Sequence, residues 1–157
     1  MQTISPFLWF DDQAAEAMHF YTSVFKNSKI LEVSHYGEAG PGPAGQVMVA
    51  SFELNGQKFM ALNGGPEFKF NEAISFLVDC KDQEEVDYYW SRLGEGGSEG
   101  QCGWIQDKFG VWWQVVPDKL PELLSDSDRE KAGRAMAAML KMQKLDVAAL
   151  ERAFDGK

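Results

Sequence analysis

Hydrophobic and polar positions follow the same order along two separate stretches of the chain. Residues 5–10 and 73–79 each read as a buried strand, and each leads into an amphipathic helix, over 12–25 and 82–93. Strand pairs follow both helices. The pattern predicts one βαββ-type unit written twice, forming a curved mixed sheet or half-barrel of the α+β class.

In the first unit, Asp12 is expected to cap the helix. The positions expected to face the sheet are Ala14, Ala17, Met18, Tyr21, Val24 and Phe25. A strand over 29–36 and a hairpin over 46–54 and 57–62 follow, the latter turning at Asn55-Gly56, a strong two-residue turn signal. The connection over 37–45 holds four Gly and two Pro, and reads equally well as the border of a site or as a plain surface excursion.

In the second unit, Asp82 and Glu85 form a variant of the capping box. The buried stripe of its helix is expected to be Val86, Tyr89, Trp90 and Leu93. A closing hairpin is predicted over 101–106 and 111–116, and the loop over 94–100 stands where a full repeat would have a strand. The second unit therefore reads as the shorter one.

After Pro117 the pattern is helical only. Ser127 with Glu130 reads as a capping box, Asp146 as the cap of a last helix, and Gly156 as its stop. The apolar stripes are Met136, Met139 and Leu140, then Leu150 and Phe154. We expect one domain over 1–157, made of modules 1–66 and 67–117 and the helices 118–157, whose stripes pack on the sheets or on a second subunit.

Composition and charge exclude several classes of binding partner. The chain has 157 residues, 45% of them hydrophobic, and a formal charge of −9, which disfavours nucleic acid and anionic membrane surfaces. No apolar run reaches the length of a membrane span, and Met1 to Ile4 lack the features of a signal peptide, so a cytoplasmic location is expected. Cys80 and Cys102 are expected to be buried free thiols, with a redox role as the alternative.

These elements and several motifs resemble the PhnB-like branch of the vicinal oxygen chelate superfamily, often labelled 3-demethylubiquinone-9 3-methyltransferase. That superfamily includes glyoxalase I, extradiol dioxygenases and bleomycin-resistance proteins. The matching motifs are P-F-L-W-F at 6–10, A-M-H-F-Y at 17–21, L-N-G-G-P at 62–66, F-N-E-A-I-S-F at 70–76, Q-E-E-V-D-Y-Y-W at 83–90, Q-C-G-W-I-Q-D-K-F-G-V-W-W-Q-V-V-P at 101–117 and A-M-L-K-M-Q-K-L-D-V-A-A-L at 138–150.

The resemblance implies a metal site in many relatives, with four ligands, usually His and Glu, on inward-facing strand positions. Aligning this chain by its helices and turns puts those positions at Ser5, Ser51, Ala73 and Gln114. Neutral hydroxyl and amide oxygens are weak ligands and Ala is none. The sequence therefore predicts no metal and no other cofactor.

Other catalytic chemistry has little support. His19 is expected at the edge of the first helix and His35 on a strand, neither beside a Cys or acid at ligand spacing. The glycines at 94–97 follow a helix and lead into a hairpin, which is the wrong context for a phosphate loop. The methyltransferase label has no cofactor motif behind it and stays as an alternative.

Strand alternation from the aligned positions predicts one inward face, which would line a mostly apolar cleft. The candidate ligand-binding residues are Phe7, Trp9, Ser51, Glu53, Asn63, Ser75, Trp104, Trp112 and Gln114. The alternative is that the aromatic members simply fill the core. Asn63 and Trp104 are expected at the cleft mouth, and Glu53 is its one ionisable group.

The function expected from these residues and the resemblance is metal-free binding of a small, partly aromatic or apolar molecule, without chemistry. The alternative is an enzyme of the superfamily: an isomerase or lyase, a dioxygenase-like enzyme, or the methyltransferase of the label. A homodimer is expected, because the resemblance implies paired subunits and two-fold association is common.

Overall fold

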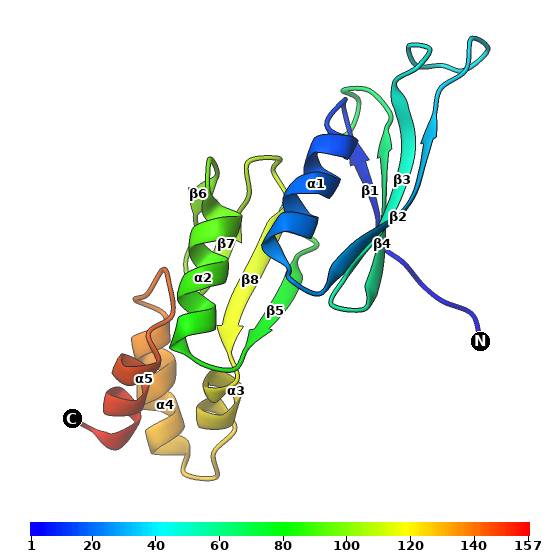
Figure 1. Ribbon diagram of the computed structural model, residues 1–157. Coiled ribbons are helices and arrows are strands. Elements are labelled where there is room, and N and C mark those ends of the chain that lie inside the picture. Colours follow the sequence, from blue (N-terminus) through cyan, green and yellow to red (C-terminus); the bar gives the residue numbers. More distant parts are fainter. The chain divides into compact units, whose positions relative to one another are not determined.

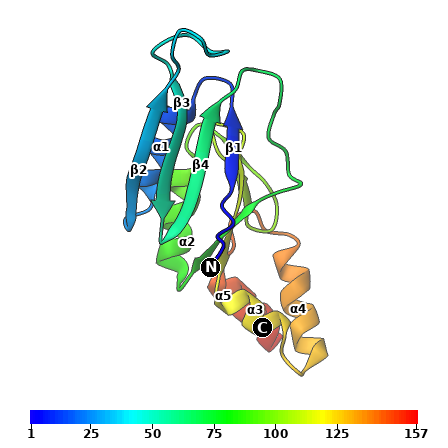
Figure 2. The same ribbon diagram turned by 90° about the vertical axis from the view of Figure 1, so that its right-hand side faces the viewer.

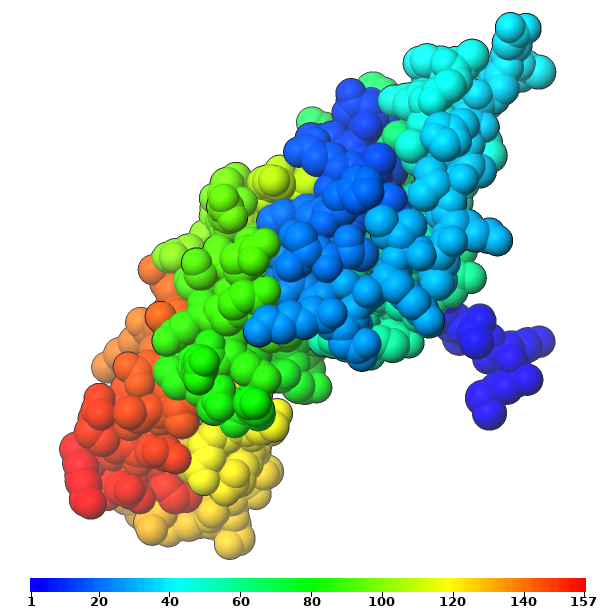
Figure 3. Space-filling view, viewed as in Figure 1, coloured from blue at the N-terminus to red at the C-terminus, as the bar shows by residue number.

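The computed structural model describes all 157 residues, which form eight strands and five helices (Figure 1). Their order is β1 (Phe7–Phe10), α1 (Ala14–Val24), β2 (Ser28–His35), β3 (Val47–Leu54), β4 (Gln57–Asn63), β5 (Phe76–Cys80), α2 (Gln83–Gly94), β6 (Ser98–Glu99), β7 (Trp104–Gln106), β8 (Trp112–Pro117), α3 (Lys119–Leu124), α4 (Arg129–Met139) and α5 (Val147–Asp155). The chain divides into two compact units, Met1–Lys69 and Phe70–Lys157. Figure 3 shows the first residues of unit 1 projecting from it as a dark-blue arm.

Unit 1 is a four-stranded mixed sheet in the order β1-β4-β3-β2, in which β1 runs parallel to β4 and the other pairs are antiparallel. Helix α1 packs on one face, and every residue expected to point at the sheet is buried. Tyr21 stacks on Phe52, which stacks on Phe59, with ring centroids 6.2 and 5.7 Å apart. The opposite face of this sheet carries no helix of unit 1 (Figure 2).

The predicted start of α1 is wrong in one detail. Gln13, not Asp12, is the N-cap, and its side chain makes no capping hydrogen bond. The first amide is satisfied from a distant strand, because Ala14 donates its backbone N–H to Oδ1 of Asn63 at 2.8 Å. The predicted hairpin turn is confirmed, with Asn55 and Gly56 both in the left-handed region at φ 49° and 83°.

Unit 2 repeats the arrangement with the order β5-β8-β7-β6, with β5 parallel to β8, and helix α2 packs against strands of this sheet. The duplicated α+β fold is therefore confirmed. Strand β5 begins three residues later than predicted, at Phe76. The loop over 94–100 holds the two-residue strand β6 in place of the eight-residue β2, so the expected missing strand is present but short.

The start of α2 is as predicted. Asp82 accepts a hydrogen bond from the amide of Glu85 at 3.0 Å, and the carboxylate of Glu85 accepts from Lys81 rather than from the cap residue itself. Val86, Trp90 and Leu93 are buried, whereas Tyr89 is half-buried.

The last forty residues form three helices around a small core of Leu120, Leu123, Ala135, Leu145 and Leu150. Helix α3 was not predicted. The cap of α4 is Asp128, whose side chain accepts from the amide of Lys131, so the prediction of Ser127 is wrong. The predicted cap Asp146 and the left-handed stop Gly156 of α5 are confirmed.

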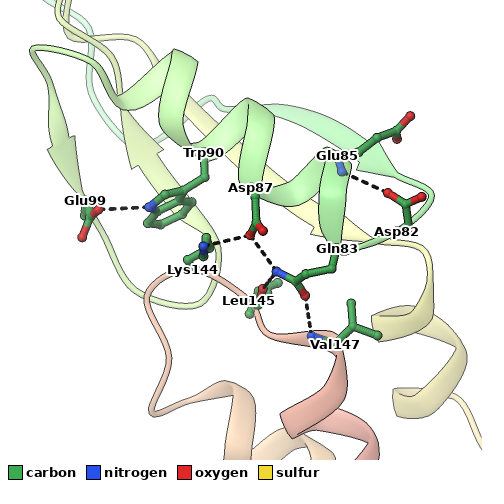
Figure 4. Close-up of polar contacts among 9 residues, drawn as sticks. All are labelled: Asp82, Gln83, Glu85, Asp87, Trp90, Glu99, Lys144, Leu145 and Val147. Atoms are coloured by element: carbon green, nitrogen blue, oxygen red, sulfur yellow. Dashed lines mark hydrogen bonds and ion pairs between the residues drawn. The ribbon is translucent and has the colours of Figure 1, made fainter.

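A polar clasp holds the segment before α5 to α2 (Figure 4). Gln83 donates from Nε2 to the carbonyl of Leu145 at 3.0 Å and accepts from the amide of Val147 at 2.8 Å. Beside it, Nζ of Lys144 lies 2.8 Å from the carboxylate of Asp87. None of the helices combines the length and hydrophobicity that a membrane span requires.

Candidate ligand-binding faces of the two sheets

The uncovered face of the first sheet carries two rows of side chains that run straight across its strands. Strand register aligns Phe7, Met60, Ser51 and Glu32 in one row. It aligns Trp9, Leu62, Val49 and Ser34 in the next. Because cross-strand partners point to the same face of a sheet, each row brings aromatic, apolar and polar groups together on one surface.

A groove of about 440 Å³ lies over these rows and is lined by Glu32, Val33, Ser34, Val49, Ser51 and Met60. Ser51 is 6% exposed and lines this groove. Ser34 donates to the carbonyl of Val49 at 3.3 Å. The groove therefore offers a carboxylate and a serine hydroxyl above an apolar floor, a common make-up of a small-molecule site.

Trp9 lies on the same face, but a loop of unit 1 covers part of it. Its Nε1 donates to the carbonyl of Gly65 at 2.9 Å, and its ring meets that of Phe68 edge to face. A Cβ at Gly64 would overlap the indole, so the close approach of this loop requires glycine there. Phe7 is 51% exposed beside it.

Two predicted site residues, Asn63 and Glu53, make side-chain contacts within unit 1. Asn63 is 3% exposed and ties three segments: its side chain accepts from Ala14 and donates to the carbonyl of Val47 at 2.9 Å, and its carbonyl accepts from the hydroxyl of Tyr36. Glu53 pairs with Lys29 at 3.1 Å, at a smaller hollow of about 110 Å³ near the β3–β4 turn.

The corresponding face of the second sheet carries the remaining four predicted residues. Strand register aligns Leu77, Gln114 and Trp104 in one row, and Gln114 donates from Nε2 to the hydroxyl of Ser75 at 2.9 Å. Trp104 and Trp112 meet edge to face with centroids 6.4 Å apart. The indole N–H of Trp112 is buried without an acceptor, so it is a hydrogen-bond donor that the chain leaves unused.

The strand order corrects the alignment of the two repeats. Since β4 occupies the place of β8, the residue equivalent to Gln114 is Met60, and Ser51 is equivalent to Trp104. Since β1 occupies the place of β5, Ser5 is equivalent to Ser75, not to Ala73.

The corrected positions do not suit a divalent cation. Unit 1 offers a hydroxyl and a thioether there, and unit 2 a hydroxyl and an amide whose nitrogen already points at that hydroxyl. Such neutral donors bind divalent metals poorly. In neither unit do three or more His, Cys, Asp or Glu side chains gather closely enough to hold a metal.

The groups with nucleophilic or acid–base character lie elsewhere. Burial raises the pKa of the Cys80 thiol to about 12, with Glu85 adding to the effect, so this thiol is inert at neutral pH. Cys102 is half-buried rather than buried, and both cysteines are free. His19 and His35 are exposed, on α1 and at the end of β2.

Sequence reasoning missed Glu32, Ser34 and Met60 in the groove and Asp107 behind the second sheet. Asp107 is 2% exposed and accepts from the indole of Trp113 at 2.9 Å and from the amides of Phe109 and Val111. Strand alternation, over β2 for Glu32 and Ser34 and over β4 for Met60, was the signal for the groove residues. Asp107, an acid three residues before the turn glycine Gly110, gave no signal of burial.

Two mixed sheets of this order, each with a helix on one face, define the vicinal oxygen chelate fold. The family model described as 3-demethylubiquinone-9 3-methyltransferase matches residues 2–116, and the chain belongs to that family. No curated protein matches the chain.

One solved structure at 40% identity supports the family, and two at lower identity share the fold. A Bacillus cereus PhnB protein, described as a 3-demethylubiquinone-9 3-methyltransferase, is 40% identical with a TM-score of 0.69, and the match covers 74% of this chain and 99% of that one. Protein PA1353 of Pseudomonas aeruginosa is 23% identical, with a TM-score of 0.62 and coverage of 74% and 98%. The fosfomycin resistance protein FosX of Listeria monocytogenes shares the fold at 17% identity, with a TM-score of 0.56 and coverage of 80% and 98%.

Proposed function

We propose that this protein binds a small organic molecule in the groove of the first sheet, without a metal ion. The observation that carries the proposal is the groove of about 440 Å³, in which the hydroxyl of Ser51 and the carboxylate of Glu32 lie beside the apolar side chains of Val49 and Met60. A few polar groups in an apolar lining are the usual make-up of a small-molecule site, and a ligand that pairs with this hydroxyl would complete it.

The lining sets the chemistry of the ligand. Val49 and Met60 favour an apolar body, and Glu32 favours a hydrogen-bond donor or a positive charge next to it. The volume is that of a compact ligand. Phe7 and Trp9, in the same rows, extend the apolar surface beyond the groove toward β1.

Catalysis is the alternative, because the family description names a methyl transfer and FosX is named for fosfomycin resistance. Glu32 is the one carboxylate of the groove, and neither a second acid nor a histidine lines it beside the hydroxyls of Ser34 and Ser51. Catalysis usually pairs such groups within hydrogen-bond reach. Binding is therefore the function that this groove supports best.

The test uses native mass spectrometry to look for a co-purified ligand, followed by calorimetric titration of that compound. We expect Ser51→Leu, which fills the groove, to abolish binding, and Glu32→Gln to weaken it. Ser91→Leu, on α2, is the matched control. Titration with Zn²⁺, Mn²⁺ and Ni²⁺ completes the test: stoichiometric binding of a metal that Gln114→Ala abolishes would overturn the metal-free proposal, and full affinity in Ser51→Leu would overturn the groove.

We also propose that the protein forms a homodimer. Large apolar side chains stand exposed on both units, including Phe7 at 51%, Leu77 at 56% and Leu140 at 60%. Exposed apolar surface of this kind marks interaction sites. Light scattering is expected to give twice the chain mass of 17.6 kDa, and a stable monomer at micromolar concentration would contradict the proposal.

A further inference from the structure

Helix α4 carries an apolar stripe that nothing in the chain covers. Gly133, Met136, Ala137 and Leu140 are spaced at i, i+3, i+4 and i+7, so they lie on one face. Met136 is 41% exposed and Leu140 60%. The opposite face packs on α3 and α5, which both lie on one side of α4 in Figure 2.

The stripe alternates small and large residues in a way that fits a copy of itself. When two α4 helices run antiparallel about an axis between Met136 and Ala137, Leu140 meets the partner's Gly133 and Met136 meets the partner's Ala137. A Cβ at Gly133 would find nothing within 4 Å, so the space that the partner's Leu140 needs is open. Alternating large and small side chains is how helix faces interdigitate.

The charges beside the stripe are also self-complementary. Glu130 lies in the first turn of α4 and Lys141 directly follows the C-cap Leu140, so these opposite charges stand at opposite ends of the helix. An antiparallel pair brings Glu130 toward the partner's Lys141, and the reverse contact is made by symmetry. The Glu130 side chain is 88% exposed, and its one ion pair is a long contact of 3.8 Å with Arg134.

We propose that α4 is a self-association surface, pairing antiparallel with α4 of a second copy across a two-fold axis. The helices belong to the part of the chain that lies beyond the family match at 2–116, and the B. cereus relative is covered almost completely by 74% of this chain. Relatives thus have the two sheets without these C-terminal helices. The helices are therefore not needed for the shared fold, and self-association is a role that the exposed stripe of α4 can fill. The ligand groove plays no part in the argument.

The test is sedimentation of the full chain and of three α4 variants. Leu140→Glu is expected to weaken self-association at least a hundredfold, because it places carboxylates in an apolar contact. Ile74→Glu is the matched control at an exposed apolar position outside α4. Circular dichroism confirms that each variant is folded, as expected for side chains with this exposure.

The charge-reversed variants make the test specific to the antiparallel geometry. Glu130→Lys brings like charges together twice and is expected to weaken association up to about tenfold, as two surface pairs would. Adding Lys141→Glu restores both contacts and the original affinity, although the Arg134 pair stays broken. Three outcomes would overturn the proposal. The wild type is a monomer; Leu140→Glu leaves the dimer unchanged; or Ile74→Glu dissociates the dimer and Leu140→Glu does not. In the last two outcomes a homodimer remains, held by another surface.

Discussion

The rings of Trp9 and Phe68 meet edge to face, with centroids 5.0 Å apart and planes inclined at 77°. Phe68 is 58% exposed and lies in the loop that also accepts the indole hydrogen bond of Trp9. An aromatic side chain of the protein therefore already packs against the indole. A flat ligand that stacks on Trp9 must share it with Phe68 or displace it.

Replacing Phe68 by Ala should expose Trp9 with little loss of stability, since most of the Phe68 ring is already in water. We expect acrylamide to quench fluorescence more strongly in Phe68→Ala than in wild type, and this difference to disappear in a Trp9→Phe background. Ile74→Ala is the control for a general effect of removing an exposed apolar side chain. Unchanged quenching would show that the loop does not shield Trp9.

Trp112 should respond differently to two substitutions. Trp112→Phe removes a buried N–H that has no acceptor and keeps an aromatic ring, so the free energy of unfolding should fall by less than about 1 kcal/mol or rise. Trp112→Ala also removes the contact with Trp104, and a loss of about 3–5 kcal/mol would show that the residue is packing. A small loss with weakened ligand binding would show that Trp112 lines a site. Urea unfolding with calorimetric titration of both variants separates the two roles.

Asn63 should prove structural rather than ligand-binding. Asn63→Ala leaves the amide of Ala14 and the carbonyl of Val47 without their side-chain partners. Leaving a buried polar group unpaired should lower the free energy of unfolding by about 1–3 kcal/mol. Chemical denaturation measures the loss, and hydrogen exchange should show faster opening at the start of α1. Asn71→Ala is the control, because Asn71 is exposed and makes one local contact, to Ala73. A stable Asn63→Ala protein with impaired ligand binding would reverse this assignment.

The elements of the fold could be predicted because their signals are local. Period-two strands, helical stripes and the Asn55-Gly56 turn depend on neighbours in sequence. The α1 cap could not be predicted, since its acceptor, Asn63, lies forty-nine residues away from Ala14. The α4 cap was mispredicted for a local reason: Asp128, next to the predicted Ser127, is the residue whose side chain accepts from the amide of Lys131.

The sequence could predict which side chains share one face of the sheet, but not the groove that they form with other segments. Alternation placed Phe7, Trp9 and Ser51 on one surface. It did not show that Phe68 folds over Trp9 or that Glu32 stands beside Ser51, because both depend on pairing across the chain. The repeat alignment erred because Ser51 and Gln114 were matched by distance from a turn, although they lie on opposite arms of their hairpins.

The contacts between α2 and the C-terminal helices have two parts, the hydrogen bonds of Gln83 and the ion pair of Lys144 with Asp87, and each can be removed separately. Gln83→Ala deletes both hydrogen bonds to the segment around Leu145 and Val147, and we expect faster hydrogen exchange at Val147 and through α5 while the sheets keep their protection. Gln57→Ala, at an exposed glutamine with one neighbouring contact, is the control. Unchanged exchange in α5 would show that apolar packing alone holds the tail.

Low pH should break the ion pair between Lys144 and Asp87, because the carboxylate becomes protonated. The hydrogen bond from Lys144, then that from Gln83, lowers the pKa of Asp87 below its ordinary value near 3.8. A depressed folded-state pKa adds stability above the unfolded value, and that contribution is lost as pH falls from about 3.8 through the folded pKa. The effect is small because both side chains are about half exposed. Lys144→Met should therefore lower α5 protection slightly at pH 7, where the pair contributes, leave it unchanged in strong acid, and so flatten the fall below pH 4. A wild-type-like acid profile in Lys144→Met would show that this ion pair does not hold the tail.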